Sequence, residues 1–231
     1  MDKMEYGILK AIDRHLIKIY VLIMALQYHI KRYEDVNTIL DKYENIIKAQ
    51  CYELRFSFFY DFITTHESMC LTRSNVIVAN PAWASKLILF NNSEIEDVFL
   101  ITSGHEMTHI EKEFSYRHLK AENRKFVKWV NEVHADFGGA KIMADSSKER
   151  LLSCIDYKIR LKSLGKQYWI KRLIRQLIGS THPSWQQRRI YAETGVFDKA
   201  LIETIAINTG CIDKDLVNDV VNYYQEIVLN D

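Results

Sequence analysis

Two histidines and a glutamate stand in a spacing that suits metal binding and the activation of water. His105 and His109 are four residues apart, so on a helix both imidazoles lie on one face and can reach a single ion. Glu106 adjoins His105, where its carboxylate can take a proton from a metal-bound water. Two histidines and a water leave tetrahedral zinc one protein ligand short. The sequence therefore predicts zinc-assisted hydrolysis, provided that a third ligand returns to this helix.

The third ligand is expected on a second helix that runs back beside the first. If the motif helix extends to about residue 119 and the chain turns at 120–123, a helix rising about 1.5 Å per residue regains the level of the motif near residues 130–134. Glu132 stands there, and Asp136 follows one turn later. Asp136 is placed to accept the second N–H of a metal-binding histidine.

Two other interpretations of this stretch remain open. His134 competes with Glu132 for the metal, but it lies about 200° around the helix, so both cannot face one ion. Glu132 and Asp136 could also form a solvated helix edge.

The motif helix is predicted to begin at Ser93, since Ser93 and Glu96 form a capping box. Apolar residues then recur at helical spacing on one face, and the two histidines continue that face; its members are Ile95, Val98, Thr102, His105 and His109. This pattern favours a buried site over a solvated one.

Helical patterns fill most of the remaining chain, with a small sheet before the motif helix. Two helices are expected within residues 5–50, and others at 126–140, 150–164, 166–178 and after a turn at 181–185. Residues 75–79 and 85–90 read as two strands separated by Pro81, while 51–62 is ambiguous between helix and strand. The apolar stripe of the 126–140 helix contains Phe126, Val130, Val133, Phe137 and Ala140, and Gly138 and Gly139 interrupt it.

These patterns predict an α+β, mostly α-helical fold with a zincin-like core. We expect one domain, 1–231, made of an N-terminal helical region (1–62), a metallopeptidase core (63–192) and C-terminal helices (193–231). The length suits one domain of this size.

Composition gives little sign of nucleic-acid or membrane binding by the whole chain. The 231 residues carry a formal net charge of +1. The scattered cysteines, Cys51, Cys70, Cys154 and Cys211, contain no C-x-x-C pair and predict reduced thiols in a cytoplasmic protein. No signal peptide is visible, and the apolar run 16–26 is too short to span a bilayer.

The N-terminal helix has an apolar stripe that we interpret as core. Its members are Ile8, Ile12, Leu16, Ile19, Ile23 and Leu26. The alternative is a helix that lies on a membrane surface.

Residues 158–189 form a basic segment, with nine Lys or Arg and no Asp or Glu. Solvated helix faces are one interpretation. The other is a patch for an acidic protein partner or nucleic acid, although the segment contains no clear nucleic-acid motif.

The chain resembles the M48-type gluzincin zinc metallopeptidases over roughly residues 75–192. In that family a strand pair leads into the H-E-x-x-H helix, and the third ligand is the Glu of an E-x-x-A-D-x-x-G pattern. Glu132, Ala135, Asp136 and Gly139 match that pattern. The turn Thr181-His182-Pro183 with the downstream Arg188 is similar to the family's H-P turn, and the spacing leaves Arg189 as an alternative to Arg188. The short interval between His109 and Glu132 and the absence of membrane helices are also similar to compact cytosolic zinc peptidases of the ImmA/IrrE and Lit types.

The resemblance implies a zinc-dependent endopeptidase that acts on a protein or peptide substrate. His105, His109 and Glu132 would hold zinc, and Glu106 would move the proton from water to the leaving amine. His182 would donate to the developing oxyanion, although it could also be a turn histidine with a local hydrogen bond. Arg188 would pair with an acidic site residue or orient the substrate.

A substrate is expected to lie extended along an edge strand at 85–91. The aromatic run Phe56, Phe58, Phe59 and Tyr60 could line a pocket, although core packing explains it as well.

Two rival functions remain. One is an inactive, zinc-binding relative that works through interactions of the 158–189 segment. The other is a basic helical interaction protein with an accidental motif. The retained Glu106 argues against the first, because a structural zinc does not need that carboxylate.

Overall fold

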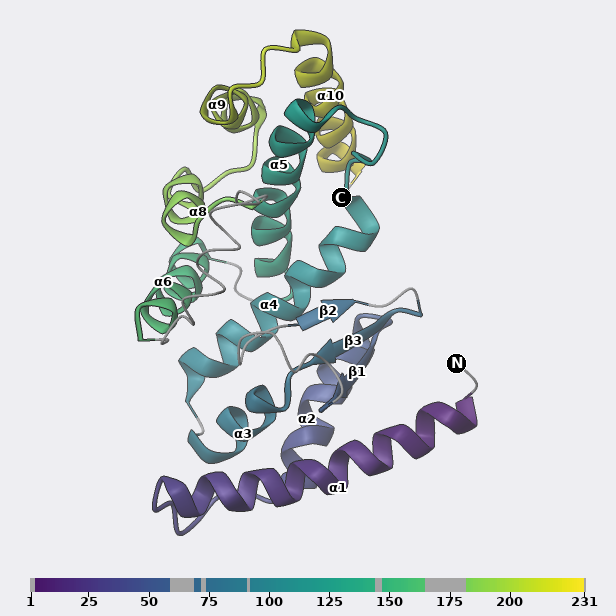
Figure 1. Ribbon diagram of the computed structural model, residues 1–231, viewed down its shortest axis with the longest axis vertical. Helices are drawn as coiled ribbons and strands as arrows, with labels where there is room; N and C mark the ends of the chain where they lie inside the picture. Colours follow the sequence, from purple (N-terminus) through teal and green to yellow (C-terminus); the bar gives the residue numbers. More distant parts are fainter. Residues whose placement is uncertain are drawn as a thin grey trace. The chain divides into compact units, whose positions relative to one another are not determined.

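The computed structural model describes residues 3–58, 69–71, 74–90, 92–143, 147–164 and 182–230. Most of these residues are helical, and three short strands form one sheet (Figure 1). The predicted α+β, mostly helical class is therefore confirmed. None of the described helices is both long and apolar enough to cross a membrane.

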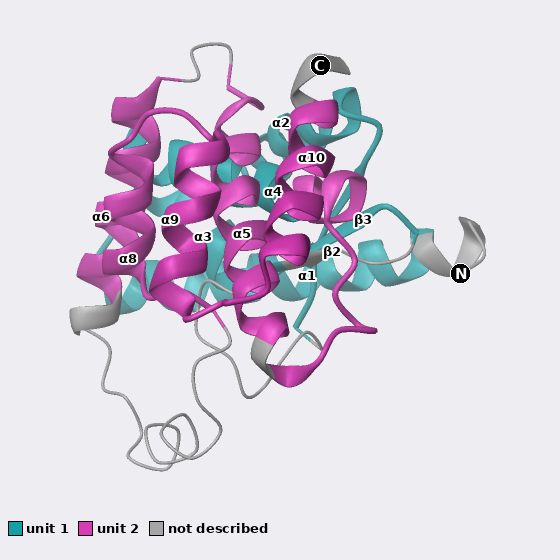
Figure 2. Cartoon of the chain, turned by 90° about the horizontal axis from the view of Figure 1, so that it is seen from above, with its two compact units in different colours: residues 1–106 teal, residues 107–231 magenta. Residues whose placement is uncertain are grey.

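The chain divides into two compact units, Met1–Glu106 and Met107–Asp231, coloured separately in Figure 2. The boundary falls inside helix α4 (Ser93–Lys112), which continues through it. The motif His105–His109 lies in this continuous helix, so its i, i+4 spacing on one face is preserved.

Unit 1 contains a small mixed sheet with helices before and after it. The sheet order is β1-β3-β2, with β1 parallel and β2 antiparallel to the central β3. Its strands are β1 (Glu53–Phe56), β2 (Met69–Leu71) and β3 (Val76–Ala79). Besides α4, its helices are α1 (Lys3–Gln27), α2 (Val36–Ala49) and α3 (Pro81–Phe90). The strand predicted at 75–79 is confirmed, and within the ambiguous stretch 51–62 residues 53–56 form the strand β1.

The prediction of a second strand at 85–90 is wrong, because these residues belong to α3. Pro81 takes the first helical position, where its missing N–H costs nothing, and the Asn80 side chain accepts the Ala82 N–H at 2.9 Å. Trp83, Ser85 and Leu87 are all buried, so α3 is apolar on several sides and lacks a clear period. The prediction of a substrate-binding edge strand at 85–91 is therefore wrong as well.

The predicted core stripe of α1 is also wrong. Ile17 and Val21 are buried, whereas Ile12 and Ile19 are exposed. Ion pairs explain the orientation: the Arg55 guanidinium in β1 pairs with the buried Asp13, and in the same turn of α1 Lys10 and Arg14 pair with carboxylates of α2. These ion pairs therefore hold one face of α1 against α2 and β1, and the large aliphatic side chains of the opposite face point outward.

Unit 2 is built around helix α5 (Ala121–Ala140). The stripe predicted for this helix is confirmed: Phe126, Val130 and Val133 are buried against later helices. Those helices are α6 (Lys148–Leu164), α8 (Trp185–Ala192), α9 (Lys199–Thr209) and α10 (Lys214–Asn230). The α5 core gives Glu132, one residue before Val133, a rigid backbone on which to project its side chain.

Candidate metal centre

The motif helix begins as predicted at Ser93, but another side chain caps it. The Asn92 amide oxygen accepts the Glu94 N–H at 2.8 Å. The expected capping box between Ser93 and Glu96 is thus replaced by an Asn cap, because the cap lies one residue earlier. Glu96 instead pairs with Lys42 at 2.8 Å.

Helix α4 ends earlier than predicted, and the loop that connects it to α5 is longer than predicted. Helix α4 ends at Lys112, and α5 begins at Ala121. Asn131, on α5, binds this loop through its amide N–H groups, which donate to the Glu113 carboxylate and the Phe114 carbonyl, both at 3.0 Å. The loop therefore supplies the length assigned to helix, and Glu132 still reaches the level of the histidines.

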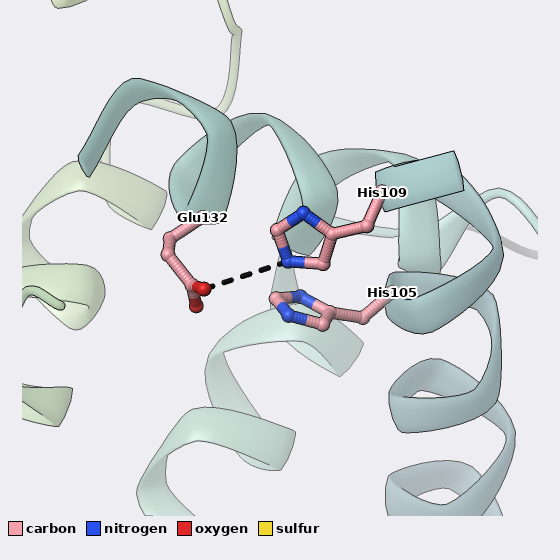
Figure 3. Close-up of side chains that lie close together, drawn as sticks. All are labelled: His105, His109 and Glu132. Carbon is pink, nitrogen blue, oxygen red and sulfur yellow. Dashed lines mark ion pairs between the residues drawn. The ribbon is translucent and has the colours of Figure 1, made fainter. Parts of the chain in front are cut away.

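His105, His109 and Glu132 form the group that could hold a metal ion among the described residues. One ligand atom from each side chain lies within 4.8 Å of the other two. Figure 3 shows both imidazoles projecting from α4 toward the Glu132 carboxylate on the neighbouring helix. The His109 Nε2 and Glu132 Oε1 atoms are 3.5 Å apart.

One distance in this group is compatible with a tetrahedral metal ion. Ligand atoms about 2.0–2.2 Å from a tetrahedral zinc ion lie roughly 3.4 Å from one another, close to the separation of His109 and Glu132. Two imidazole nitrogens and a carboxylate oxygen are also a common donor set for catalytic zinc. Within the described chain the group has three members, which leaves one tetrahedral position for water or substrate. Structural zinc sites usually close that position with a fourth side chain.

His134 does not join the group. It is buried, with its ring 4.4 Å from the Tyr224 ring and 4.9 Å from the Phe197 ring, measured between centroids. His134 therefore lies on the side of α5 away from Glu132, as the angle of about 200° between the two positions predicts. Glu132 is only partly exposed and ion-paired, and Asp136 is buried, so these two carboxylates do not form a solvated helix edge.

Glu106 follows His105 on α4 and is partly buried. This exposure is compatible with a carboxylate that meets water. Its role as a base remains a prediction.

Helix α8 carries the predicted arginine. The Ser184 hydroxyl accepts the Gln187 N–H at 3.2 Å, while the Gln187 side chain accepts the Ser184 N–H at 2.9 Å. This capping box starts α8 directly after His182 and Pro183. It fixes Arg188 on the first turn of a well-defined helix.

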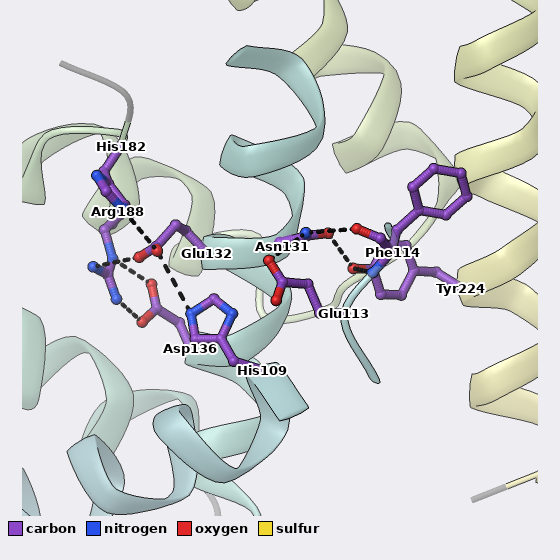
Figure 4. Close-up of polar contacts among 9 residues, drawn as sticks. All are labelled: His109, Glu113, Phe114, Asn131, Glu132, Asp136, His182, Arg188 and Tyr224. Atoms are coloured by element: carbon purple, nitrogen blue, oxygen red, sulfur yellow. Dashed lines mark hydrogen bonds and ion pairs between the residues drawn. The ribbon is translucent and has the colours of Figure 1, made fainter. Parts of the chain in front are cut away.

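Arg188 joins two carboxylates of α5. Its Nε donates to Asp136 at 2.7 Å, its Nη2 pairs with the same carboxylate, and its Nη1 donates to Glu132 at 3.3 Å (Figure 4). The guanidinium lies 3.9 Å from the Trp185 ring. Burial lowers the pKa of Arg188, but the charges of Asp136 and Glu132 outweigh it, so the pKa is raised and the cation is permanent. Asp136 thus supports the site through Arg188; a hydrogen bond from a metal-binding histidine to Asp136 stays a prediction.

The neighbouring Arg189 has different partners. It pairs with Asp156 and Glu193 in a more exposed position. Between the two arginines that the H-P turn left open, Arg188 is the one that reaches Glu132.

His182 contacts one oxygen of the Glu132 carboxylate, and Arg188 contacts the other. The His182 Nε2 is 3.4 Å from Glu132 Oε1, yet the imidazole is not a member of the metal-ligand group. Partial burial lowers the pKa of His182, and the cations Lys128 and Arg188 add to this, while Glu132 acts against it. His182 therefore contacts the carboxylate of a candidate metal ligand, and its side chain stays 59% exposed.

A polar network that the sequence did not reveal anchors the loop after α4. The Tyr224 hydroxyl of α10 donates to the side-chain amide oxygen Oδ1 of Asn131 at 2.6 Å and accepts the Phe114 N–H at 3.4 Å (Figure 4). Asn131 immediately precedes Glu132, so this buried network holds the backbone next to a metal ligand. No local sequence signal marks it, because its members come from positions 113 to 224.

Gly138 lets α5 approach α4 beside the site. A Cβ atom at this position would lie 2.4 Å from the Thr108 Oγ1 and 2.5 Å from its Cγ2. Thr108 adjoins His109, so the distance between the two ligand-bearing helices depends on the missing side chain. The sequence suggested that Gly138 and Gly139 interrupt this helix. They do not, because α5 continues to Ala140.

Gly138→Ala is expected to destabilise the fold by about 1–3 kcal/mol through overpacking. Chemical unfolding monitored by circular dichroism measures this. Gly7→Ala is the matched control, since Gly7 lies in a helix with open space around it and the change there should stabilise the helix by up to about 1 kcal/mol. Removing the colliding atoms with Thr108→Ala should recover part of the loss in the double variant. An unchanged stability in Gly138→Ala alone would contradict the close approach.

The basic segment 158–189 is described only at its two ends. Lys158 and Arg188 are buried, and Arg189 is paired with two carboxylates. Arg160, by contrast, is exposed, with its guanidinium over the Tyr157 ring. The helix predicted at 166–178 lies outside the described residues. So do Phe59 and Tyr60 of the aromatic run, whose Phe56 packs in the core of unit 1.

Comparisons with protein-family models, with curated proteins and with solved structures found no match to this chain. The resemblance to gluzincins therefore rests on the sequence motifs and stays a prediction. The chain contains a His-His-Glu group able to hold a metal ion.

Proposed function

We propose that this protein is a zinc-dependent metalloendopeptidase of the gluzincin type. The observation that carries the proposal is the convergence of His105, His109 and Glu132 from two helices, with Glu106 next to the first histidine. A purely structural site would not need that glutamate.

The proposed ligands are the two histidines and Glu132, and the proposed ion is zinc. Zinc held there would supply Lewis acidity, which lowers the pKa of water and polarises the scissile carbonyl. Glu106 takes the proton of the attacking water and passes it to the leaving amine, so that one water and one peptide bond give a carboxylate and an amine.

His182 and Arg188 have different roles in this proposal. His182 donates a hydrogen bond to the oxygen on which negative charge develops, because it lies beside Glu132 and remains partly exposed. Arg188 is a positioning residue that acts through Glu132, since it is buried and its guanidinium contacts the Glu132 carboxylate. Partners of a metal ligand of this kind typically change metal affinity by 10–100-fold when they are removed.

The substrate proposed is a protein or peptide, and the proposed location is the cytoplasm. The three cysteines that the structure describes, Cys51, Cys154 and Cys211, are free thiols, as a reducing compartment favours.

The test is metal-dependent cleavage by the purified chain. We expect close to one zinc per chain by elemental mass spectrometry, hydrolysis of an unstructured protein such as casein, loss of hydrolysis with a chelator and recovery on adding zinc. His109→Ala should lose both zinc and hydrolysis. His118→Ala is the matched control, because His118 is an exposed histidine of the loop after α4. Zinc content that is equally low in wild type and His109→Ala would contradict the proposal.

A further inference from the structure

The outer face of α1 carries a continuous row of exposed aliphatic side chains. They alternate at spacings of four and three residues, interrupted once by the exposed His15: Ile8, Ile12, His15, Ile19, Leu22 and Leu26. A repeat averaging 3.5 residues is the seam of a coiled coil and not the broader stripe of a helix that packs on a globular core. Exposure of the aliphatic members ranges from 45% for Ile12 to 68% for Leu26.

The opposite face of α1 is already used within unit 1. Asp13, Ile17, Val21 and Ala25 are buried, and α1 packs on α2, α3 and β1. The seam is therefore additional to the contacts that hold α1 in its unit.

The exposed area reaches what a stable dimer needs. Ile23 widens the seam, and together these half-exposed aliphatic side chains present on the order of 600 Å² of apolar surface, the upper end for the largest patch of a typical monomer. Two such faces would bury about 1,200 Å² in total, which reaches the lower limit of specific interfaces.

The seam is complementary to itself when two copies run antiparallel. One register places Ile8 beside Leu26, Ile12 beside Leu22 and His15 beside Ile19. Each core position a of one helix then meets a core position d of the other, as in antiparallel coiled coils. A parallel pair would instead place His15 against its own copy in the apolar seam, where buried imidazoles are costly. We propose that two copies of this chain pair antiparallel through the outer face of α1.

A membrane surface fits this face less well. Helices that lie on membranes carry free basic residues beside the apolar face. In α1, Lys10 pairs with Glu44, and Arg14 pairs with Asp41 and Glu44. Their charge is largely neutralised within the unit. Among the α1 side chains that the structure describes, Lys18 is the remaining exposed lysine or arginine, fewer than membrane-surface helices usually carry.

Sedimentation equilibrium of the full chain tests the pairing. We expect a dimer at micromolar concentration, and Ile19→Glu should raise its dissociation constant about 100-fold or more, since the dimer carries the change twice. Thermal unfolding of the monomer should be unchanged, because Ile19 is exposed there. Ile212→Glu is the matched control: Ile212 is 93% exposed and lies outside α1. A monomeric wild type, with or without binding to anionic vesicles, overturns the proposal, and so does a dimer that survives Ile19→Glu.

Cysteine cross-linking tests the orientation. In a Cys51→Ser background, which removes the exposed native thiol, Ile12→Cys and Leu22→Cys should each remain uncross-linked alone and should form a disulfide-linked dimer when mixed. Cross-linking of each variant with itself would show parallel pairing and overturn the antiparallel register.

Discussion

Glu106→Gln is expected to lower kcat for protein hydrolysis by about 10²–10⁴-fold while zinc content stays at the wild-type value. The amide is nearly the same size as the carboxylate, so α4 and its two histidines should keep their positions. It cannot accept the proton of the attacking water, and general base catalysis has about that magnitude. Steady-state hydrolysis together with elemental analysis of the same samples measures both quantities.

Glu111→Gln is the matched control, because Glu111 lies near the end of the same helix and is exposed. Its hydrolysis and zinc content should equal those of wild type. Equal hydrolysis by wild type and Glu106→Gln would exclude Glu106 as the base, even if zinc is bound.

The same pair of proteins separates the rival functions. An inactive zinc-binding relative would contain zinc and generate no new protein N-termini in either form. An accidental motif in an interaction protein would contain no stoichiometric zinc. N-terminal proteomics of the native host that expresses wild type or Glu106→Gln would identify substrates, since only cleavages absent from the variant depend on the proposed base.

The metal-ligand group was predictable from the sequence because helical geometry carries most of the information. The i, i+4 spacing of His105 and His109 places both on one face of any helix, and the angle between Glu132 and His134 decides which of the two can face these histidines. An error of several residues in the end of α4 did no harm, because the apolar stripe of α5 fixes which side of that helix turns inward.

The errors have equally specific causes. The run 85–90 is apolar at nearly every position, so periodicity cannot distinguish a strand from a buried helix. Helix α1 has two apolar faces, and the choice between them depends on the ion pair of Asp13 with Arg55, which are 42 residues apart. Long-range pairs of this kind, like the contact between Asn131 and Tyr224, leave no local pattern.

Arg188→Met is expected to destabilise the metal-free protein by about 3–5 kcal/mol, the usual cost of leaving one member of a buried ion pair. Asp136 is buried, and the variant removes the cation that neutralises its carboxylate. Denaturant unfolding in the presence of a chelator measures the loss without a contribution from bound zinc.

Arg189→Met provides the matched control. Arg189 is adjacent in sequence and also has two carboxylate partners, but its side chain is 37% exposed against 9% for Arg188. Exposed ion pairs contribute little to stability because water screens them, so this variant should unfold almost as wild type does. Equal losses in both variants would contradict a special role for burial.

The double variant Arg188→Met/Asp136→Leu distinguishes stability from the support of the metal ligand. Replacing the whole pair by apolar side chains removes the uncompensated charge, so most of the lost stability should return. Glu132 would still lack the 3.3 Å hydrogen bond from Arg188, and zinc affinity should therefore remain about 10–100-fold below wild type. Competition with a chelator of known affinity measures this. If zinc affinity recovers together with stability, Arg188 serves the fold alone and does not position Glu132.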